Sequence, residues 1–186
     1  GREREVGKQV AAFGGHKVMI VYGKKGGHIE TSGLLDLVHK SLSDAGLSYV
    51  DLNGVVPNPR LSLVKEGIRI GRAQGVDFLL PIGGGSVIDT AKGIGYGIAN
   101  DFEMEDLLYG RVKTDKNLPI GVILTIAAAG SEMSSSMVLT IEDGMMKRSY
   151  GHDCARPRFA IMNPELTYSL SAYQTASGAA DIMMHT

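Results

Sequence analysis

The chain has a single cysteine, Cys154, among its 186 residues. One cysteine excludes an intrachain disulfide framework and is typical of proteins in a reducing compartment. No apolar run reaches the roughly 18 residues that a membrane span needs, and no signal peptide is recognisable at the start. We therefore expect a cytoplasmic protein that does not interact with membranes.

An excess of charge of one sign is also missing. Lys and Arg number 19 and Asp and Glu number 20, which gives a formal net charge of −1 at pH 7. The sequence holds no basic run and no aromatic residues interleaved with basic ones, so nothing supports nucleic-acid binding. It contains enough Val, Ile and Leu for a core, and its length suits one large domain, or one domain and a piece of another.

Apolar runs alternate with segments of helical spacing along most of the chain. The predicted strands are 16–23, 47–55, 76–83, 118–126, 136–143 and 157–164, and a Gly-containing turn is expected to join the last two. The predicted helices of this part are 32–46, 60–75 and 86–99. Strands and helices in alternation predict an α/β fold with a Rossmann-like, doubly wound, mostly parallel sheet.

The stretch LLPIGGGSVIDTAK, residues 79–92, places three glycines between a strand and a helix. Glycine has no Cβ, so another group can approach its backbone closely. A helix N-terminus presents unpaired N–H groups and the positive end of the helix dipole. Gly84, Gly85 and Ser86 are therefore predicted to bind a phosphate at the carboxyl end of a strand. A tight strand–helix turn without a ligand is the alternative.

Asp89 and Lys92 follow this turn at helical spacing. In one interpretation Ser86 caps the helix, Asp89 completes a capping box, and Lys92 pairs with Asp89 on the surface. In the other interpretation Asp89 and Lys92 line the floor of a cofactor cleft, which makes them candidate catalytic residues. The local sequence leaves both interpretations open.

The segment 169–186 begins a helix of small residues in which Ser171 has a capping-box pattern. Asp181 and His185 are four residues apart and therefore share one face of this helix. A carboxylate and an imidazole at that spacing form half of a divalent metal site, although ordinary helices also contain such pairs by chance. The helix stops at Thr186 without a cap, which predicts that the chain is cut there.

Taken together, these motifs resemble the iron-containing (group III) alcohol dehydrogenase family. GGGSVIDTAK is preceded by VVPNPRLSLVKEG and followed by LTIAAAGSEMSSSMVLT and DIMMHT, in register from about Gly1 to Thr186. The resemblance is strongest to the NADPH-dependent butanol dehydrogenases and aldehyde reductases. It implies a dinucleotide-binding domain over 1–164. It also implies that 165–186 is the first helix of an all-helical metal-binding domain whose remainder the chain lacks.

The resemblance also assigns roles to individual positions. The glycine turn would bind the cofactor diphosphate, and Asp181 and His185 would be the first two ligands of Fe²⁺ or Zn²⁺. The other two metal ligands of the family are histidines further downstream. Three further positions match cofactor contacts, the last of them near the ribose: Asn58, Thr125 and Lys147.

Three positions depart from the family pattern. Ala129 replaces a threonine, which removes a hydroxyl contact near the cofactor. Asn163 stands where an aspartate is usual, which removes a charge. Ser171 and Ala172 replace a pair of prolines at the start of the last helix.

Gly23, Lys24 and Lys25 follow the first predicted strand. Family members that prefer NAD tend to carry an acidic residue here, which accepts a hydrogen bond from the ribose 2′-OH and repels a 2′-phosphate. Glycine removes that charge, and two lysines attract a phosphate. We therefore expect NADP(H) rather than NAD(H). Lysines that only solvate a loop are the alternative.

For the whole protein, the resemblance implies a metal-dependent alcohol dehydrogenase or aldehyde reductase that acts on a primary alcohol or aldehyde of butanol type. It also implies a homodimer at full length. The fragment alone is expected to be inactive, because it supplies only two metal ligands. A stand-alone NADP(H)-binding module and a related glycerol-type dehydrogenase are the alternatives.

Overall fold

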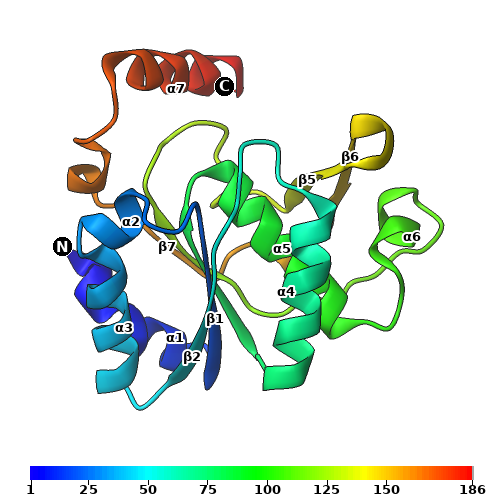
Figure 1. The fold of residues 1–186 in the computed structure, drawn as a ribbon, viewed down its shortest axis with the longest axis horizontal. Coiled ribbons are helices and arrows are strands. Elements are labelled where there is room, and N and C mark those ends of the chain that lie inside the picture. The colour runs from blue at the N-terminus through cyan, green and yellow to red at the C-terminus, as the bar shows by residue number, and fades with distance from the viewer. Residues whose placement is uncertain (186) are drawn as a thin grey trace.

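The computed structural model describes residues 1–185, and a five-stranded parallel sheet lies at its centre (Figure 1). The strand order is β2-β1-β3-β4-β7. The strands are β1 Lys17–Tyr22, β2 Ser48–Leu52, β3 Phe78–Gly83, β4 Gly121–Leu124 and β7 Phe159–Ile161. The chain order reverses between β1 and β3, so the predicted doubly wound sheet is confirmed. Ligands of such sheets bind at the carboxyl ends of the strands beside this reversal.

Helices cover both faces of the sheet (Figure 1). The helices are α1 Val6–Ala12, α2 His28–Thr31, α3 Leu34–Asp44, α4 Leu61–Gln74, α5 Gly85–Ala99, α6 Met104–Leu108 and α7 Ala172–His185. Alternate side chains of β1 enter separate buried clusters: Val18 and Ile20 pack with α1 and α3, whereas Met19 and Val21 pack with α4 and α5. Strands covered on both faces are apolar along their length, which explains why the sequence predicted them well.

A two-stranded antiparallel hairpin lies outside the main sheet. It consists of β5 Ser136–Ile141 and β6 Met146–Gly151. The expected direct connection between the last two predicted strands is therefore wrong: β5 pairs with β6, and β7 runs parallel to β4 in the main sheet. The sequence MKRSYG of β6 gave no strand signal, because most of its side chains are exposed and it has no apolar alternation.

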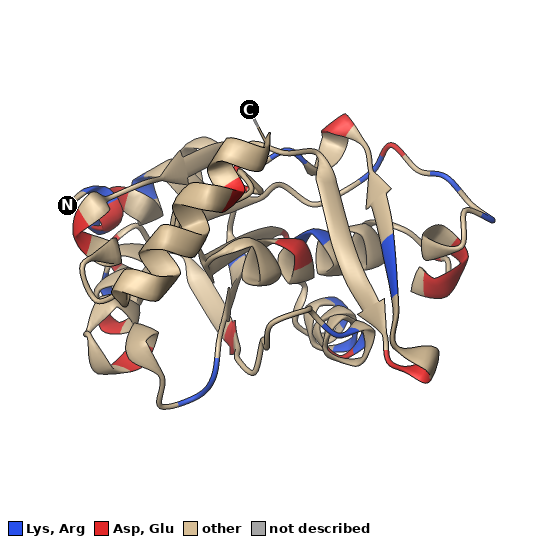
Figure 2. Cartoon of the chain, turned by 90° about the horizontal axis from the view of Figure 1, so that it is seen from above, with Lys and Arg blue, Asp and Glu red and all other residues tan. Residues whose placement is uncertain are grey.

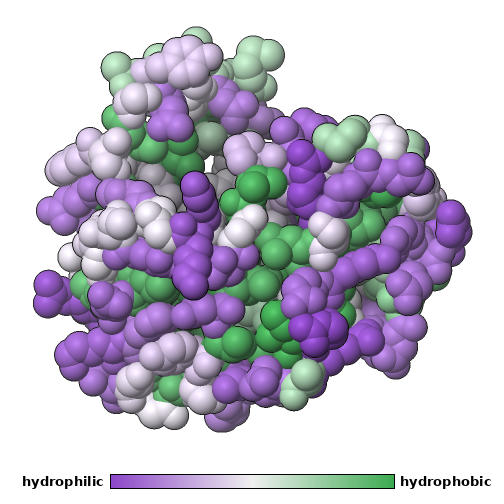
Figure 3. All heavy atoms as spheres, in the orientation of Figure 1, coloured by the Kyte–Doolittle hydropathy of each residue, from purple (hydrophilic) through white to green (hydrophobic). Residues whose placement is uncertain are grey.

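The last helix, α7, lies above the carboxyl ends of the strands (Figure 1). Ser171 caps it as predicted, since its Oγ accepts a hydrogen bond from the Gln174 N–H at 3.2 Å. Apolar side chains on its surface stay exposed (Figure 3), among them Tyr173, Met183 and Met184. Short 3-10 helices are Arg2–Glu5, Asp143–Met145, Asp153–Ala155 and Pro164–Thr167. Within residues 1–185, every helix is too short or too polar to cross a membrane.

Candidate functional site

The glycine turn joins β3 to α5 at the carboxyl end of the sheet. Gly83 ends β3, Gly84 is the N-cap residue, and α5 begins at Gly85. The N-cap residue Gly84 has no side chain that could cap α5, so the first N–H groups of this helix have no side-chain partner at that position. Seen from above, α5 runs between α7 and the hairpin (Figure 2). The predicted phosphate-binding turn therefore lies beside the reversal of strand order.

Gly84 and Gly85 have different surroundings. A Cβ on Gly84 would overlap Cγ2 of Ile126, so packing alone requires glycine there. The nearest atom to a Cβ on Gly85 would be Cβ of Ser131, at 3.9 Å, an ordinary contact. Packing within the protein does not explain Gly85, whereas close approach of a ligand to its backbone does.

The capping-box interpretation of the turn is wrong. The side chain of Ser86 makes no cap hydrogen bond. Asp89 instead accepts hydrogen bonds from the Ser131 hydroxyl, at 2.7 Å, and from the Val138 N–H, at 2.9 Å. Lys92 is fully buried rather than on the surface. Both side chains contact a segment that is about forty residues distant in sequence, which a local motif cannot reveal.

The ammonium of Lys92 donates to three backbone carbonyl oxygens, those of Ser131, Ser134 and Ser136, each at 2.8 Å. Burial lowers the pKa of Lys92 to about 8, and the neighbouring Asp89 carboxylate opposes that shift. Burial likewise raises the pKa of Asp89, against its two hydrogen bonds and the charge of Lys92. A catalytic role for this pair stays a prediction; in this structure both side chains bind the loop.

The predicted cofactor contacts gather around the same edge of the sheet. The Thr125 N–H donates to the carbonyl of Gly83 at 3.2 Å, which places Thr125 beside the glycine turn. The Gly54 N–H donates to the carbonyl of Gly23 at 2.9 Å, so the segments after β1 and β2 also meet. Five segments remote in sequence thus converge here: those after β1, β2, β3 and β4, and the hairpin.

Two more predicted contacts, Asn58 and Lys147, lie on opposite sides of β5 in the hairpin region. The Thr140 N–H donates to the carbonyl of Pro59 at 2.8 Å, and Thr140 pairs with Lys147 across the hairpin. Asn58 precedes that proline and has a positive φ of 58°. The register of β5 and β6 therefore aligns Asn58 and Lys147 on either side of one strand.

A carboxylate that the sequence pattern did not reveal, Glu30 of α2, holds the loop after β1. Glu30 accepts hydrogen bonds from the Gly26 N–H at 2.8 Å and from the Tyr22 hydroxyl at 3.0 Å. Burial and this carboxylate raise the pKa of Tyr22 to about 12. Lys24 and Lys25 are exposed on the same loop. Glu30 lies on a four-residue helix beyond the loop, and nothing in its local sequence marks it.

The predicted metal half-site lies on α7, which rests on the loop between β4 and β5. Gly178 is the contact point, since a Cβ there would lie 2.6 Å from the carbonyl oxygen of Ala127. Asp181 Oδ1 and His185 Nε2 are 3.8 Å apart, so both face the same side of α7. Residues 1–185 contain no group of three or more His, Cys, Asp or Glu side chains that could hold a metal. The two predicted ligands therefore lie together without a third such donor among the residues described.

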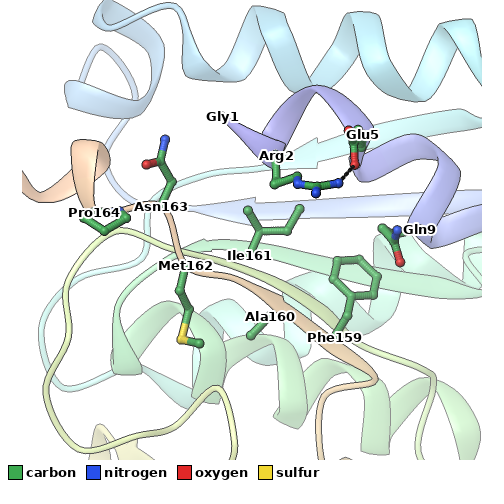
Figure 4. A pocket seen from close by; sticks show the side chains of 10 residues that line it. All are labelled: Gly1, Arg2, Glu5, Gln9, Phe159, Ala160, Ile161, Met162, Asn163 and Pro164. Atoms are coloured by element: carbon green, nitrogen blue, oxygen red, sulfur yellow. Dashed lines mark hydrogen bonds and ion pairs between the residues drawn. The ribbon is translucent and has the colours of Figure 1, made fainter.

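A cavity of about 460 Å³ lies elsewhere, at the outer edge of the sheet (Figure 4). Its wall includes Phe159 and Ile161 of β7 together with the N-terminal helical segment. The Arg2 guanidinium at its rim is already paired with Glu5 at 2.7 Å. None of the residues predicted to bind cofactor or metal lines this cavity.

The chain is similar in sequence to a known protein family and to several characterised proteins. The sequence model of the iron-containing alcohol dehydrogenase family matches residues 1–164. NADH-dependent butanol dehydrogenase A of Clostridium acetobutylicum is 41% identical over 181 residues, which cover 97% of this chain and 46% of that protein. The NADPH-dependent aldehyde reductase of Escherichia coli is 34% identical over 174 residues, which cover 91% of this chain and 44% of that protein.

A solved structure gives the same result. The crystal structure of NADH-dependent butanol dehydrogenase A from Thermotoga maritima matches with a TM-score of 0.95 at 34% identity, covering 100% of this chain and 46% of that one. The chain thus spans about half the length of the relatives it matches. On its sequence and its fold, this chain belongs to the iron-containing alcohol dehydrogenase family.

Proposed function

We propose that the protein containing this chain interconverts primary alcohols and aldehydes, with NADP(H) as the hydride carrier and Fe²⁺ or Zn²⁺ as the metal. The proposal rests on the start of α5 at Gly85, which has no side-chain cap and lies beside the reversal of strand order. It offers backbone N–H groups and room for close approach where parallel sheets bind dinucleotides. The names of the relatives support the same substrate class.

In this proposal the chain's own residues bind and orient the cofactor. The backbone of Gly84, Gly85 and Ser86 holds the diphosphate. Thr125 follows β4 beside the turn, and Asn58 and Lys147 approach from the hairpin side. A cofactor fixed at these points has its nicotinamide ring oriented before any reaction, which lowers the entropic part of the barrier.

The preference for NADP(H) rests on the loop after β1. Gly23 provides no carboxylate, and a Cβ there would meet nothing closer than the Val55 carbonyl oxygen at 3.8 Å, so the site is open. Lys24 and Lys25 are exposed beside it and can pair with a 2′-phosphate. The Glu30 carboxylate accepts hydrogen bonds from two neutral donors, which hold it against Gly26 and Tyr22. Relatives are named both as NADH-dependent and as NADPH-dependent, so Gly23, Lys24 and Lys25 are the features that support NADP(H).

Asp181 and His185 would hold the metal. An oxygen and a nitrogen donor one helical turn apart suit either Fe²⁺ or Zn²⁺. Bound there, the metal supplies Lewis acidity toward an alcohol or carbonyl oxygen, and the nicotinamide supplies hydride transfer. A catalytic site needs about three protein ligands. We therefore propose that 165–186 opens a second, helical domain that completes the set, and that this chain alone is inactive.

The first test titrates this chain with NADPH and with NADH and follows the nicotinamide fluorescence. We expect saturable binding, with NADPH at least about tenfold tighter because of the extra ion pairs. Gly85→Val, which fills the space at the turn, is expected to abolish the binding of both cofactors. Equal affinities would contradict the NADP(H) preference only. No binding of either cofactor would overturn the proposed nucleotide site.

The second test uses the full-length protein loaded with Fe²⁺ or Zn²⁺. Short aldehydes and alcohols are compared with glycerol as substrates. We expect turnover of butanal and a loss of about 100-fold or more in kcat for Asp181→Ala, because one metal ligand is missing. Turnover of glycerol in preference to butanal would favour a glycerol-type dehydrogenase instead.

A further inference from the structure

The loop between β4 and β5, residues 125–135, lies between the glycine turn and α7. It holds its shape with little regular secondary structure. Ile126 packs against Gly84 of the turn, and Ala127 packs against Gly178 of α7. One loop therefore touches both the predicted diphosphate site and the helix that carries the metal half-site.

We infer that Lys92 is a positioning residue. Its ammonium holds the 125–135 loop against α5 through hydrogen bonds to backbone carbonyls, and cofactor binding at the glycine turn depends on these bonds. The inference rests on the proposed function for its second half only. It goes beyond the ligand contacts discussed above, because Lys92 would touch neither cofactor nor substrate. It acts through the backbone of Ser131, Ser134 and Ser136.

The chemistry of the contact is specific to a charged amine. An ammonium group has three N–H donors and no acceptor, and three carbonyl oxygens lie at 2.8 Å from Lys92 Nζ. Every donor is thus used, which is the condition for keeping a charge in the interior. The three acceptors span six residues of chain, so a single side chain bridges the second half of the loop and the start of β5.

Two neighbouring contacts strengthen this arrangement. Asp89, one helical turn earlier, accepts hydrogen bonds from the Ser131 hydroxyl and the Val138 N–H. The Asn117 side chain donates to the backbone carbonyl of Lys92 at 3.1 Å, which ties the segment before β4 to α5. Asp89 and Lys92 of α5 thus hold the end of the loop and the start of β5. The same helix begins at the glycine turn.

The test compares Lys92→Met with a matched surface control, Lys40→Met. Lys40 lies on α3, where it pairs with Asp44 and its side chain is 75% exposed. Amide hydrogen exchange is measured along the chain, and NADPH affinity is measured by titration. For Lys92→Met we expect amides of 125–135 to exchange about tenfold faster or more, while β1 and β3 keep their protection. NADPH affinity is expected to fall by about tenfold. The control is expected to change neither quantity.

A second variant keeps the inference testable if Lys92→Met does not fold. Ser131→Ala removes the hydroxyl that Asp89 and Lys92 both contact, at a half-buried position, and leaves the buried lysine in place. We expect the same pattern at about a third of the size, because two hydrogen bonds of the hydroxyl are lost while the three carbonyl contacts of Lys92 remain.

Each outcome has a distinct meaning. Unchanged loop exchange in Lys92→Met, or in Ser131→Ala if the first variant is unfolded, would overturn the inference. Loss of protection spread evenly over the sheet would also overturn it, because Lys92 would then be an ordinary core residue. If the wild-type chain binds neither NADPH nor NADH while the loop still loosens in the variant, the proposed function fails and the positioning of the loop stands.

Discussion

Ile126 lies against Gly84 so closely that a Cβ on this glycine would overlap the isoleucine side chain, whereas a Cβ on the next residue, Gly85, would make only an ordinary contact with Ser131. The first glycine is required by packing between the β4–β5 loop and the turn. The second is not, so its absence of a side chain points to a ligand. Substitutions at Gly84 and Gly85 can therefore test packing and cofactor binding separately.

Gly85→Ala is accordingly expected to leave stability nearly unchanged and to weaken cofactor binding. The free energy of unfolding should stay within about 1 kcal/mol of the wild type, because alanine favours a helix start at least as well as glycine. The added methyl group should raise the Kd for NADPH by about tenfold or more through obstruction of the diphosphate. Urea unfolding and fluorescence titration measure the two quantities.

Gly84→Ala is the matched control for this substitution. It adds the same methyl group one residue earlier, where it meets Ile126, and is expected to lower the free energy of unfolding by about 1–3 kcal/mol. If Gly85→Ala proves the more destabilising of the two, the separation between packing and binding is contradicted.

The loop after β1 gives a second prediction, on cofactor preference. Replacing Lys24 and Lys25 together by alanine should weaken NADPH binding by about five- to tenfold, because exposed ion pairs contribute modestly, and should leave NADH binding unchanged. Gly23→Asp should strengthen NADH binding, because the new carboxylate can accept a hydrogen bond from the ribose 2′-OH. Titration of each variant with both cofactors measures the ratio. An unchanged NADPH-to-NADH ratio in the double alanine variant would show that the lysines only solvate the loop.

The sequence predicted the main sheet because its strands are apolar on both faces, and it predicted α4 and α5 because their apolar spacing is helical. It missed β6, whose exposed polar side chains resemble a loop. The start of the chain, Arg2–Ala12, also gave no clear pattern, although Val6 and Val10 are fully buried there.

Within the candidate site, local spacing misled for a physical reason. Ser86 and Asp89 fit a capping box by sequence, yet the donors to the Asp89 carboxylate lie 42 and 49 residues further along the chain, at Ser131 and Val138. Such competition is decided by tertiary packing, which a single local motif does not contain. Glu30 illustrates the same point, since its contact to Tyr22 depends on how the loop after β1 turns back.

Asn163 gives a third prediction, on stability. Its Nδ2 donates to Oε1 of Glu3 at 2.6 Å, and Glu3 is only 3% exposed. Asn163→Asp would replace this donor by a second carboxylate facing a buried one. We expect the free energy of unfolding to fall by about 1–3 kcal/mol at neutral pH, from the lost hydrogen bond and the repulsion.

The partner substitution supplies the control. Glu3→Gln in the Asn163→Asp background restores an amide–carboxylate pair with the roles exchanged, and should recover most of the loss. The coupling energy is obtained from urea unfolding of the two single variants and the double variant. Additive effects of the two substitutions would show that the contact contributes little.

The last prediction concerns pH and follows from Lys92. Its pKa is about 8 because burial outweighs the carboxylates of Asp89 and Glu132, with Arg156 acting in the same direction as burial. In the unfolded chain the pKa returns to about 10.5. Between these values the unfolded chain binds more protons than the folded chain, so this group alone makes the free energy of unfolding rise with pH.

Cofactor affinity is expected to change in the opposite direction over the same interval. A neutral amine has two N–H donors, so above about pH 8 one of the three carbonyl oxygens loses its partner and the 125–135 loop loosens. NADPH affinity should therefore fall from about pH 7 to about pH 9.5 while the contribution of Lys92 to stability grows. Titrations and urea unfolding at matched pH measure both, and Lys92→Met should show neither trend. An NADPH affinity in the wild type that is constant across this range would contradict the link between Lys92 and the cofactor site.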